Sequence, residues 1–288
     1  MPGVNPDPLE AELVPLPRKP ASTRRSAATP ARRHSKPQVT LSIDVGGTGI
    51  KADFLDEAGK PLGAAVRIPT HYPLNPTGLI GVFKQLAAAG PGFDRISVGF
   101  PGVVRAGIVL SAPHFVRDGG EGTPVSPELE RAWDHFDLAK STSRVLGKPT
   151  RVGNDAEVQG MAVIKGKGLE VVVTLGTAFG SAIFQDGQLA VHLELAHHPC
   201  HKDKTYSEYL GEAARRKVGG KRWNRRVLLA VGLVRNLLLF DHLYVGGGNS
   251  TRVKIPLGDD VSLVSNSAGL LGGIKLWGSG PGRSRVSR

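Results

Sequence analysis

Alternating stretches of apolar and polar residues predict an α/β arrangement in the first half of the chain. Residues 41–51 predict two short strands joined by a turn of small residues, and residues 60–68 predict a third strand. Residues 77–89 carry apolar side chains at helical spacing, and residues 95–100 form a further apolar run. Strand, helix and strand at this spacing indicate an α/β sheet.

The second half repeats the strand, turn and strand pattern and adds helices. A strand is predicted at residues 150–152, followed by a polar stretch and a helix to about residue 164, and residues 171–184 predict two strands joined by a Gly-Thr turn. The other predicted elements are helices at 138–146, 205–217, 223–240 and 267–277, and a strand at 241–245.

Length and composition favour a globular protein with a large core. The chain has 288 residues, enough for one large domain or two lobes, and 40% of them are hydrophobic. No window approaches 18 uninterrupted apolar residues, so no membrane-spanning helix is predicted. Cys200 is the sole cysteine. A disulfide within the chain is therefore excluded, which suits the reducing cytoplasm.

Much of the net charge of +12 lies near the two ends of the chain. Residues 1–38, rich in Pro, Ala, Ser and Arg, predict a disordered basic tail without the apolar core of a secretory signal, and residues 278–288 predict a second such tail. Residues 1–38 and 275–288 each carry a surplus of four positive charges, whereas residues 202–235 hold ten Lys or Arg against three acids. This inner cluster is either a solvated helix face or a binding surface for a polyanion.

The first candidate site is the turn after the first predicted strand. Asp44 ends the strand, and Gly46, Gly47 and Thr48 follow it. Glycine accepts positive φ and has no side chain, so the N–H groups of this turn could approach phosphate oxygens. Asp44 would hold Mg²⁺, directly or through a bound water, and not the phosphate itself. The alternative is an ordinary hairpin turn, for which glycine pairs are typical.

A second turn of the same kind favours the phosphate interpretation. Thr174, Gly176, Thr177 and Gly180 repeat the strand, Gly-Thr turn and strand pattern, and two such hairpins facing each other could hold one phosphate chain. The pattern is neither a P-loop nor a dinucleotide fingerprint, because the Gly-Lys-Ser/Thr ending is missing and a strand follows the turn. The duplicated arrangement resembles the phosphate loops of the sugar kinase, actin and Hsp70 superfamily.

Three further segments contain candidate functional residues, and each segment also has an alternative interpretation. Asn154 and Asp155 stand where a strand ends and a helix begins, which fits both a catalytic site and a plain N-cap. Residues 111–136 join a glycine-rich loop to aromatic residues, which line a substrate cleft or anchor a surface loop through a buried Trp. Residues 197–201 hold four possible zinc ligands, but ligands this crowded need a second cluster, and the chain offers no Cys pair.

Five motifs resemble, in their order and spacing, those of the ROK family of sugar kinases. They are Asp44-x-Gly-Gly-Thr48, Gly153-Asn154-Asp155, Leu175-Gly-Thr177, Glu194-x-x-His197 and Gly246-Gly-Gly248, and the resemblance covers about residues 40–277. The string from Asp44 to Lys51, the basic segment around Trp223 and the lack of the family's Cys-rich zinc motif are similar to the polyphosphate glucokinase branch.

The resemblance implies a two-lobed actin-like ATPase / sugar kinase (ribonuclease H-like) α/β fold. The small α/β lobe would span residues 39–135 and the large α/β lobe residues 136–266, with the last helix, 267–277, returning to the small lobe. The implied protein is cytoplasmic and homodimeric, and it binds neither a membrane nor a specific nucleic acid.

The implied activity is phosphoryl transfer from polyphosphate, ATP or both to the 6-hydroxyl of glucose or a related hexose such as mannose. Asp155 would be the general base and Asp44 the Mg²⁺ ligand. The implied sugar ligands are Asn154, Glu194, His197 and His114. The implied phosphate or donor contacts are Gly46, Gly47, Thr48, Gly49, Lys51, Thr174, Gly176, Thr177 and Gly180, with Gly246, Gly247, Gly248 and Asn249 near an adenosine or farther along a phosphate chain.

Three positions depart from the family pattern. Ala178 replaces a glycine of the second loop, Ala196 replaces one before His197, and His114 stands where relatives carry a sugar-contacting Asn. The competing functions are an ATP-only hexose kinase and a non-catalytic sugar-binding ROK protein. A ROK repressor needs an N-terminal helix-turn-helix, for which residues 1–38 are too rich in proline. The folded part carries no recognised nucleic-acid-binding motif to accompany its basic tails.

Overall fold

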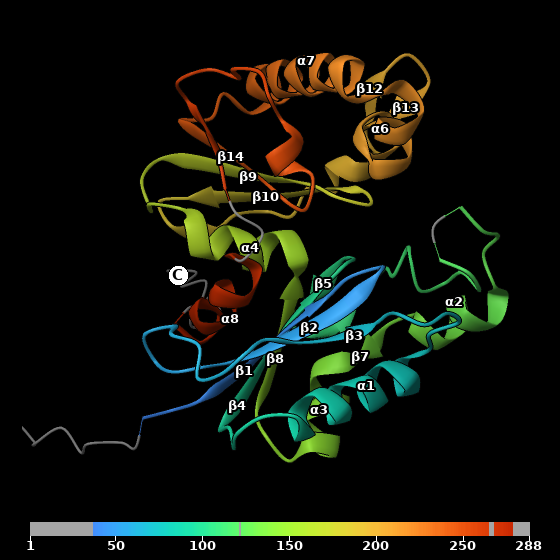
Figure 1. Ribbon diagram of the computed structural model, residues 1–288, viewed down its shortest axis with the longest axis vertical. Coiled ribbons are helices and arrows are strands. Elements are labelled where there is room, and N and C mark those ends of the chain that lie inside the picture. Colours follow the sequence, from blue (N-terminus) through green and yellow to red (C-terminus); the bar gives the residue numbers. More distant parts are fainter. Residues whose placement is uncertain (1–36, 121, 265–267, 279–288) are drawn as a thin grey trace, which may run out of the picture. The chain divides into compact units, whose positions relative to one another are not determined.

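The structure is a computed structural model that describes residues 37–120, 122–264 and 268–278. Nearly all of both predicted basic tails lies outside the described residues, as does Ser267, the predicted start of the last helix. Figure 1 shows the described chain and labels most of its helices and strands. No helix in these ranges combines the length and the apolar character that crossing a bilayer requires.

The first of two five-stranded sheets contains the first predicted hairpin. Its strands, in the order β3-β2-β1-β4-β8, are β1 (Thr40–Val45), β2 (Gly49–Leu55), β3 (Val66–Pro69), β4 (Arg95–Phe100) and β8 (Thr150–Asn154). β1 is antiparallel to β2 and parallel to β4, and β4 is parallel to β8. The carboxyl ends of β1, β4 and β8 therefore meet at one edge of the sheet, where α/β folds place their sites.

The two faces of β1 differ because successive side chains of a strand alternate. Leu41 and Ile43 belong to a buried core with Leu79 and Phe83 of α1 (Pro76–Ala88). Ser42 lies on the other face, where its hydroxyl donates to a carbonyl of α8 (Ala268–Gly278). A side chain at position 44 shares the face of position 42, so the sheet directs Asp44 toward the α8 side.

A small three-stranded sheet and a cluster of aromatic rings follow β4. The elements are β5 (Val104–Arg105), β6 (Ile108–Val109), α2 (Pro127–Trp133), β7 (Phe136–Asp137) and α3 (Leu138–Leu146). The rings of Phe100 and Phe115 pack on that of Trp133, whose indole N–H donates to the carbonyl of Leu74. Trp133 is 1% exposed. The aromatic residues here are therefore core anchors, and a substrate-lining role for this Trp is wrong.

The second five-stranded sheet contains the second predicted hairpin. Its order is β11-β10-β9-β14-β15, with β9 (Leu169–Leu175), β10 (Phe179–Gln185), β11 (Gln188–Leu189), β14 (His242–Gly246) and β15 (Val261–Leu263). The apolar face of α7 (Gly220–Leu238) packs on it through Val227, Val231 and Val234. Smaller elements complete this half: η1 (Leu195–His197), β12 (Pro199–His201), β13 (Lys204–Thr205), α5 (Tyr206–Leu210), α6 (Glu212–Val218) and η2 (Ser250–Arg252).

The helix predicted at 205–217 is two helices, α5 and α6, which meet at Gly211. A Cβ at Gly211 would lie 2.6 Å from the carbonyl oxygen of Thr177, so only glycine allows this approach to the second Gly-Thr turn. The backbone N–H of Glu212 donates to the carbonyls of Gly176 and Thr177, at 3.0 and 3.2 Å. The break thus docks the start of α6 on the turn.

α4 (Asp155–Val163) connects the two sheets: it continues β8 of the first and packs on β9 and β10 of the second. Gly160 allows this contact, since a Cβ there would strike the ring of Phe184 on β10. On its other side α4 packs against α8, where Gly272 lies on the carbonyl of Val158. Figure 1 shows α4 beside α8. The first residue of α4 is therefore held by both sheets.

Two predicted boundaries differ from the observed elements. The boundary between the lobes at residues 135 and 136 does not separate the sheets, because β8 completes the first sheet. Parallel pairing with β4 sets its place, and such pairing leaves no local signal in the sequence. The third strand, predicted at 60–68, covers only 66–69, preceded by an isolated bridge between Leu55 and Pro61.

Candidate active site

The start of α4 is fixed by a reciprocal cap. The side-chain oxygen of Asn154 accepts from the backbone N–H groups of Ala156 and Glu157, at 2.9 and 3.2 Å, and Glu157 accepts from the N–H of Asn154 at 3.3 Å. The amide nitrogen of Asn154 donates to the carbonyl of Gly102 at 2.9 Å. The N-cap interpretation of Asn154 is confirmed, and among the described contacts one amide hydrogen of Asn154 is left for a ligand.

Asp155, the first residue of α4, carries an available carboxylate. Among the described contacts, this carboxylate accepts one hydrogen bond, from the backbone N–H of the adjacent Ala156 at 2.8 Å. Burial, followed by the nearby carboxylates of Asp44, Glu194 and Glu157, raises the pKa of Asp155 to about 7, against the opposing effect of the Ala156 N–H. A carboxyl group with a pKa near neutrality is suited to accept a proton at physiological pH.

Asp44 lies close to Asp155 because of the strand register. Asp44 on β1 pairs with Gly99 on β4, and a Cβ at Gly99 would lie 3.6 Å from the Cα of Asp155. Burial raises the pKa of Asp44, and the ammonium of Lys51, its partner across the β1–β2 pair, lowers it. Two neighbouring carboxylates with hard oxygen atoms fit a divalent cation such as Mg²⁺.

The first Gly-Thr turn presents its amides. The carbonyls of Gly46, Gly47 and Thr48 accept from side chains of Thr70, Tyr72 and Arg67, at 2.7, 3.0 and 3.1 Å. Among the described contacts, none takes up the backbone N–H of Gly47 or of Thr48. Side chains thus hold the three carbonyls while two N–H groups stay available for an anion.

Of the two predicted reasons for glycine in this turn, positive φ does not apply, whereas the lack of a side chain does. Gly46, Gly47 and Gly49 do not have positive φ. A Cβ at Gly46 would lie 2.9 Å from the carbonyl oxygen of Gly49, and one at Gly49 would strike the guanidinium of Arg67. Close packing within the hairpin, and not left-handed backbone, therefore requires glycine here.

The second Gly-Thr turn rests on the third glycine turn. The N–H of Gly176 donates to the carbonyl of Ala178 at 3.0 Å, so the turn closes with alanine in place of the family's glycine. The side chain of Asn249 donates to the carbonyl of Gly176 at 3.3 Å. Gly247, with φ of +83°, packs directly on the backbone of Leu175. The structure thus brings these two predicted donor segments together.

The other residues of these segments are distributed around the two turns. Gly180 packs against Thr174 and Ala156, which places the second hairpin beside the first turn of α4. Thr177 is half-buried, Gly246 is buried against Gln159, and Gly248 is exposed.

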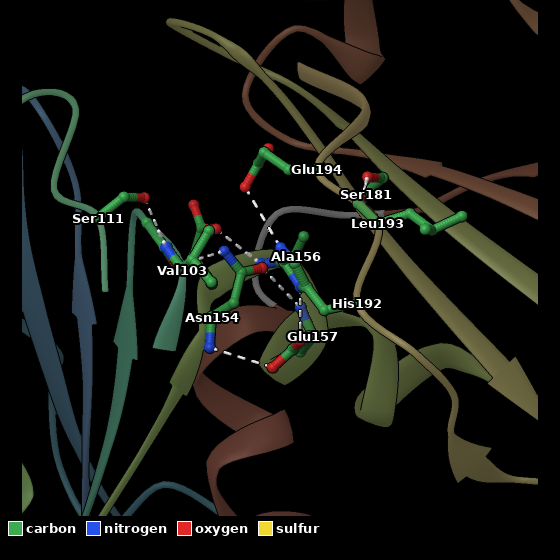
Figure 2. Close-up of polar contacts among 11 residues, drawn as sticks. Val103, Ser111, Asn154, Ala156, Glu157, Ser181, His192, Leu193 and Glu194 are labelled. Atoms are coloured by element: carbon green, nitrogen blue, oxygen red, sulfur yellow. Dashed lines mark hydrogen bonds and ion pairs between the residues drawn. The ribbon is translucent and has the colours of Figure 1, made fainter. Parts of the chain in front are cut away.

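A histidine that the sequence did not reveal joins the start of α4 to Glu194. Nδ1 of His192 lies 2.9 Å from Oε1 of Glu157, and its Nε2 lies 3.3 Å from Oε2 of Glu194. Figure 2 shows His192 between Glu157 and Glu194, beside Asn154. The hydrogen bonds to Glu157 and to Glu194 raise the pKa of His192 to about 9, against the effect of burial. Its imidazole is therefore charged at neutral pH.

The remaining predicted histidines lie apart from this bridge. His114 is half-buried with its ring against Gly47 of the first turn, and burial together with Arg117 lowers its pKa, so it is neutral. His197 is exposed on η1, and the described contacts give its side chain no partner. His192, two residues before Glu194, is the imidazole that meets the Glu194 carboxylate.

Residues 197–201, the candidate zinc segment, are spread over η1 and β12. Among the described residues, no three His, Cys, Asp or Glu side chains are grouped so that they could hold a metal ion. Burial raises the pKa of the Cys200 thiol to about 11, so it is protonated at neutral pH.

Comparison with known proteins identifies the family. Residues 40–202 match the sequence profile of the ROK family. The chain belongs to the ROK family. It is 27% identical to the polyphosphate glucokinase of Mycobacterium tuberculosis over 252 residues, which are 81% of this chain and 88% of that protein. Identity to the Mycobacterium leprae polyphosphate glucokinase is also 27%, over 277 residues, 87% of this chain and 80% of that protein.

Solved structures give the same result. The inorganic polyphosphate/ATP-glucomannokinase from Arthrobacter sp. strain KM matches with a TM-score of 0.70 and 28% identity, over 83% of this chain and 98% of that one. A ROK family glucokinase from Streptomyces griseus, solved with glucose and AMPPNP, shares the fold with a TM-score of 0.63 at 19% identity, over 83% and 98% of the two chains. The predicted family and the actin-like two-domain ATPase fold of ROK sugar kinases are confirmed.

The ionisation of Asp155 gives a prediction for stability. Its pKa is higher in the folded chain than in the unfolded chain, so the folded state retains a proton between about pH 4 and pH 7. The contribution of this group to the free energy of unfolding is fully present below about pH 4 and is lost as the pH rises through about 7. Asp155→Asn, which is always neutral, should therefore melt a few degrees above wild type at pH 8.

The measurement is Tm by calorimetry at pH 5 and pH 8, with the exposed Asp134→Asn as control. The increase in Tm of Asp155→Asn over wild type should be smaller at pH 5 than at pH 8. An equal Tm difference at both pH values would show that burial does not perturb Asp155.

Proposed function

We propose that this ROK protein is a hexose kinase that transfers a phosphoryl group from polyphosphate or ATP to the 6-hydroxyl of glucose or mannose. The observation that carries the proposal is the carboxylate of Asp155, whose pKa is raised to about 7 and which lies beside Asp44 and the first turn. Relatives named polyphosphate glucokinase and polyphosphate/ATP-glucomannokinase support the sugar and the donors.

Asp155 acts in this proposal as the general base. It accepts the proton of the 6-hydroxyl while the hydroxyl oxygen forms a bond to the terminal phosphorus and the bond from that phosphorus to the donor's bridging oxygen breaks. The donor departs as ADP or as a polyphosphate shorter by one unit. Because the transition state is loose, orientation and charge neutralisation contribute most of the rate.

A divalent metal is general among sugar kinases that use ATP or polyphosphate, and Mg²⁺ is the ion proposed here. The Asp44 carboxylate would hold it, directly or through water, since Mg²⁺ usually binds one or two carboxylates together with phosphates. The ion would neutralise charge on the donor's phosphates. Lys51, across the strand pair from Asp44, adds a cation on the same side.

The remaining contacts divide between donor and sugar. The N–H groups of Gly47 and Thr48 bind phosphate oxygens at the first turn, and Thr177 with Asn249 lies on the donor's path at the second. Asn154, through its remaining amide hydrogen, and Glu194 bind sugar hydroxyls. His114, against Gly47, contacts the sugar near the transferred group. A homodimeric, cytoplasmic protein remains part of the proposal.

The test is a product assay with purified full-length protein and Mg²⁺. Glucose, mannose and fructose are each combined with ATP and with polyphosphate, and sugar phosphate, ADP and polyphosphate length are measured. Glucose or mannose 6-phosphate from either donor is the expected product. Product from ATP alone would leave an ATP-only hexose kinase, and sugar binding without any product would indicate a non-catalytic sugar-binding protein.

A further inference from the structure

The segment before Glu194 reverses the usual placement of apolar and polar side chains. Val191 and Leu193 are 78% and 41% exposed, whereas the side chains of His192 and Glu194 between and after them are 21% and 30% exposed. In an extended chain alternate residues share a side. His192 and Glu194 therefore face inward together, and polar contacts hold this segment in place of apolar burial.

The inward face meets α4. Glu157, 6% exposed, is the third residue of that helix and completes its cap, and its second oxygen lies 2.9 Å from Nδ1 of His192. The backbone of the segment is anchored separately, since the hydroxyl of Ser181 donates to the carbonyl of Leu193 at 2.8 Å. Figure 2 shows both attachments. His192 thus links an element that continues the first sheet to a segment that leaves the second.

We propose that His192 is a positioning residue whose imidazolium, held by Glu157, fixes the Glu194 carboxylate in the direction that binds the sugar. The inference rests on the proposed function, because the sugar role of Glu194 belongs to it. A neutral imidazole has one N–H and would turn a lone pair toward one of the two carboxylates, so only the charged form donates to both. The pKa of about 9 given by Glu157 and Glu194 agrees with a charged ring.

The bridge formed by His192 between Glu157 and Glu194 also reduces the repulsion among neighbouring carboxylates. Asp155, Glu157 and Glu194 lie close enough for each of the two glutamates to raise the pKa of Asp155. A cation between the glutamates reduces their mutual repulsion and leaves the other oxygen of Glu194 available for a hydroxyl. A carboxylate oriented before binding loses less side-chain freedom when the sugar binds, which increases affinity.

The variants His192→Gln and His192→Phe test the bridge, the first retaining one donor and the second none. We expect glucose Kd by calorimetry, without donor, and KM for glucose to rise about tenfold in His192→Phe and less in His192→Gln. The kcat at saturating glucose and KM for the donor should stay within about threefold. His135→Gln, which removes an exposed His–Asp pair, is the matched control and should change neither. Unchanged glucose affinity in His192→Phe, or a fall in kcat and Tm with no change in KM for glucose, would overturn the proposal.

A pH series provides a readout that a purely structural residue would not change. The charged groups that face His192 are Glu157 from α4 and Glu194 on its own segment, with Asp155 beside them. Glucose affinity of the wild type should fall as the pH rises through about 9, and His192→Gln should lack this fall. The same pH dependence in both proteins would contradict the role of His192.

NMR titration of the His192 ring separates this inference from the proposed function. The ring should stay protonated to about pH 9 in the wild type and lose its proton at lower pH in Glu157→Gln and Glu194→Gln. A wild-type ring that titrates near pH 6.5 would overturn the bridge even if the kinase activity is found. Conversely, a wild type that binds no hexose would overturn the proposed function and the sugar role of His192, while the titration would still decide whether the bridge exists.

Discussion

Asp155→Asn should lower kcat by about 10²–10⁴-fold, the range typical of a lost general base. Asparagine keeps the size of the side chain and can still accept the N–H of Ala156, but it cannot take the proton of the 6-hydroxyl. Glucose Kd should change by no more than a few-fold, since Asn154 and Glu194 remain. Steady-state kinetics with each donor measure kcat, and calorimetric titration with glucose measures Kd.

The pH profile is the second readout of the same prediction. In the wild type kcat should rise with pH to a plateau above about 7, because Asp155 must be ionised to act as a base. The residual activity of Asp155→Asn should lack this rise. Exposed Asp134→Asn controls for the loss of a carboxylate. Near-normal kcat in Asp155→Asn would exclude Asp155 as the base.

Much of the candidate site could be predicted because its signals are local. A strand, Gly-Thr turn and strand occupy one short stretch, and both hairpins, β1–β2 and β9–β10, formed where the pattern indicated. Asn154 ends a strand and Asp155 begins a helix, which places an N-cap and a carboxylate side by side. Glu157 was within reach too, since Asn-x-x-Glu is a capping-box pattern.

The rest of the site depends on contacts between distant segments. His192 gains its role from Glu157, which lies 35 positions earlier in the chain, and no periodicity of the sequence relates the two. Gly211 divides a continuous helical pattern because it packs on Thr177, a contact that only the folded chain reveals. β8 joins the first sheet through parallel pairing with β4, so a boundary drawn from sequence order separated strands that lie together.

The cations of the basic segment 202–235 fall into two groups in the structure, and the first group is paired within the fold. Arg215 and Arg216 both pair with Glu212, at 2.7 Å each, and Arg235 pairs with Asp260. Arg226 stacks on the ring of Tyr209. These cations serve the fold, and the Arg215 and Arg216 hydrogen bonds help to lower the pKa of Glu212 to about 2.

Four of the remaining cations in the segment have no such role. Lys217, Lys221, Arg222 and Arg225 are exposed, at the end of α6 and the start of α7 (Figure 1), and the described contacts assign them no partner. α6 begins on the second Gly-Thr turn and has seven residues, so its far end lies roughly 10 Å from that turn. A polyphosphate longer than the triphosphate of ATP could extend from the turn to these cations.

Lys221→Glu combined with Arg222→Glu should therefore raise KM for polyphosphate by ten-fold or more and change KM for ATP far less. A polyanion that contacts about four cations releases counterions as it binds, so wild-type KM for polyphosphate should rise roughly 50–150-fold between 50 and 200 mM salt. The variant should show a shallower salt dependence, because fewer ions are released. KM for each donor at several salt concentrations is the measurement.

The design separates contact from net charge. Lys84→Glu combined with Lys140→Glu changes the total charge equally but on α1 and α3, beside the first sheet, where both side chains are exposed. If long-range attraction alone raised the affinity for polyphosphate, both double variants would weaken binding equally. The loss would then disappear at salt concentrations at which charges more than about 8–10 Å apart are screened. Contact with the α6–α7 cations predicts a loss in the Lys221/Arg222 variant only, growing with polyphosphate length until the chain spans them. If KM for polyphosphate and KM for ATP depended equally on salt in the wild type, this contact would be contradicted. The cations would then form the solvated helix face that the sequence also allowed.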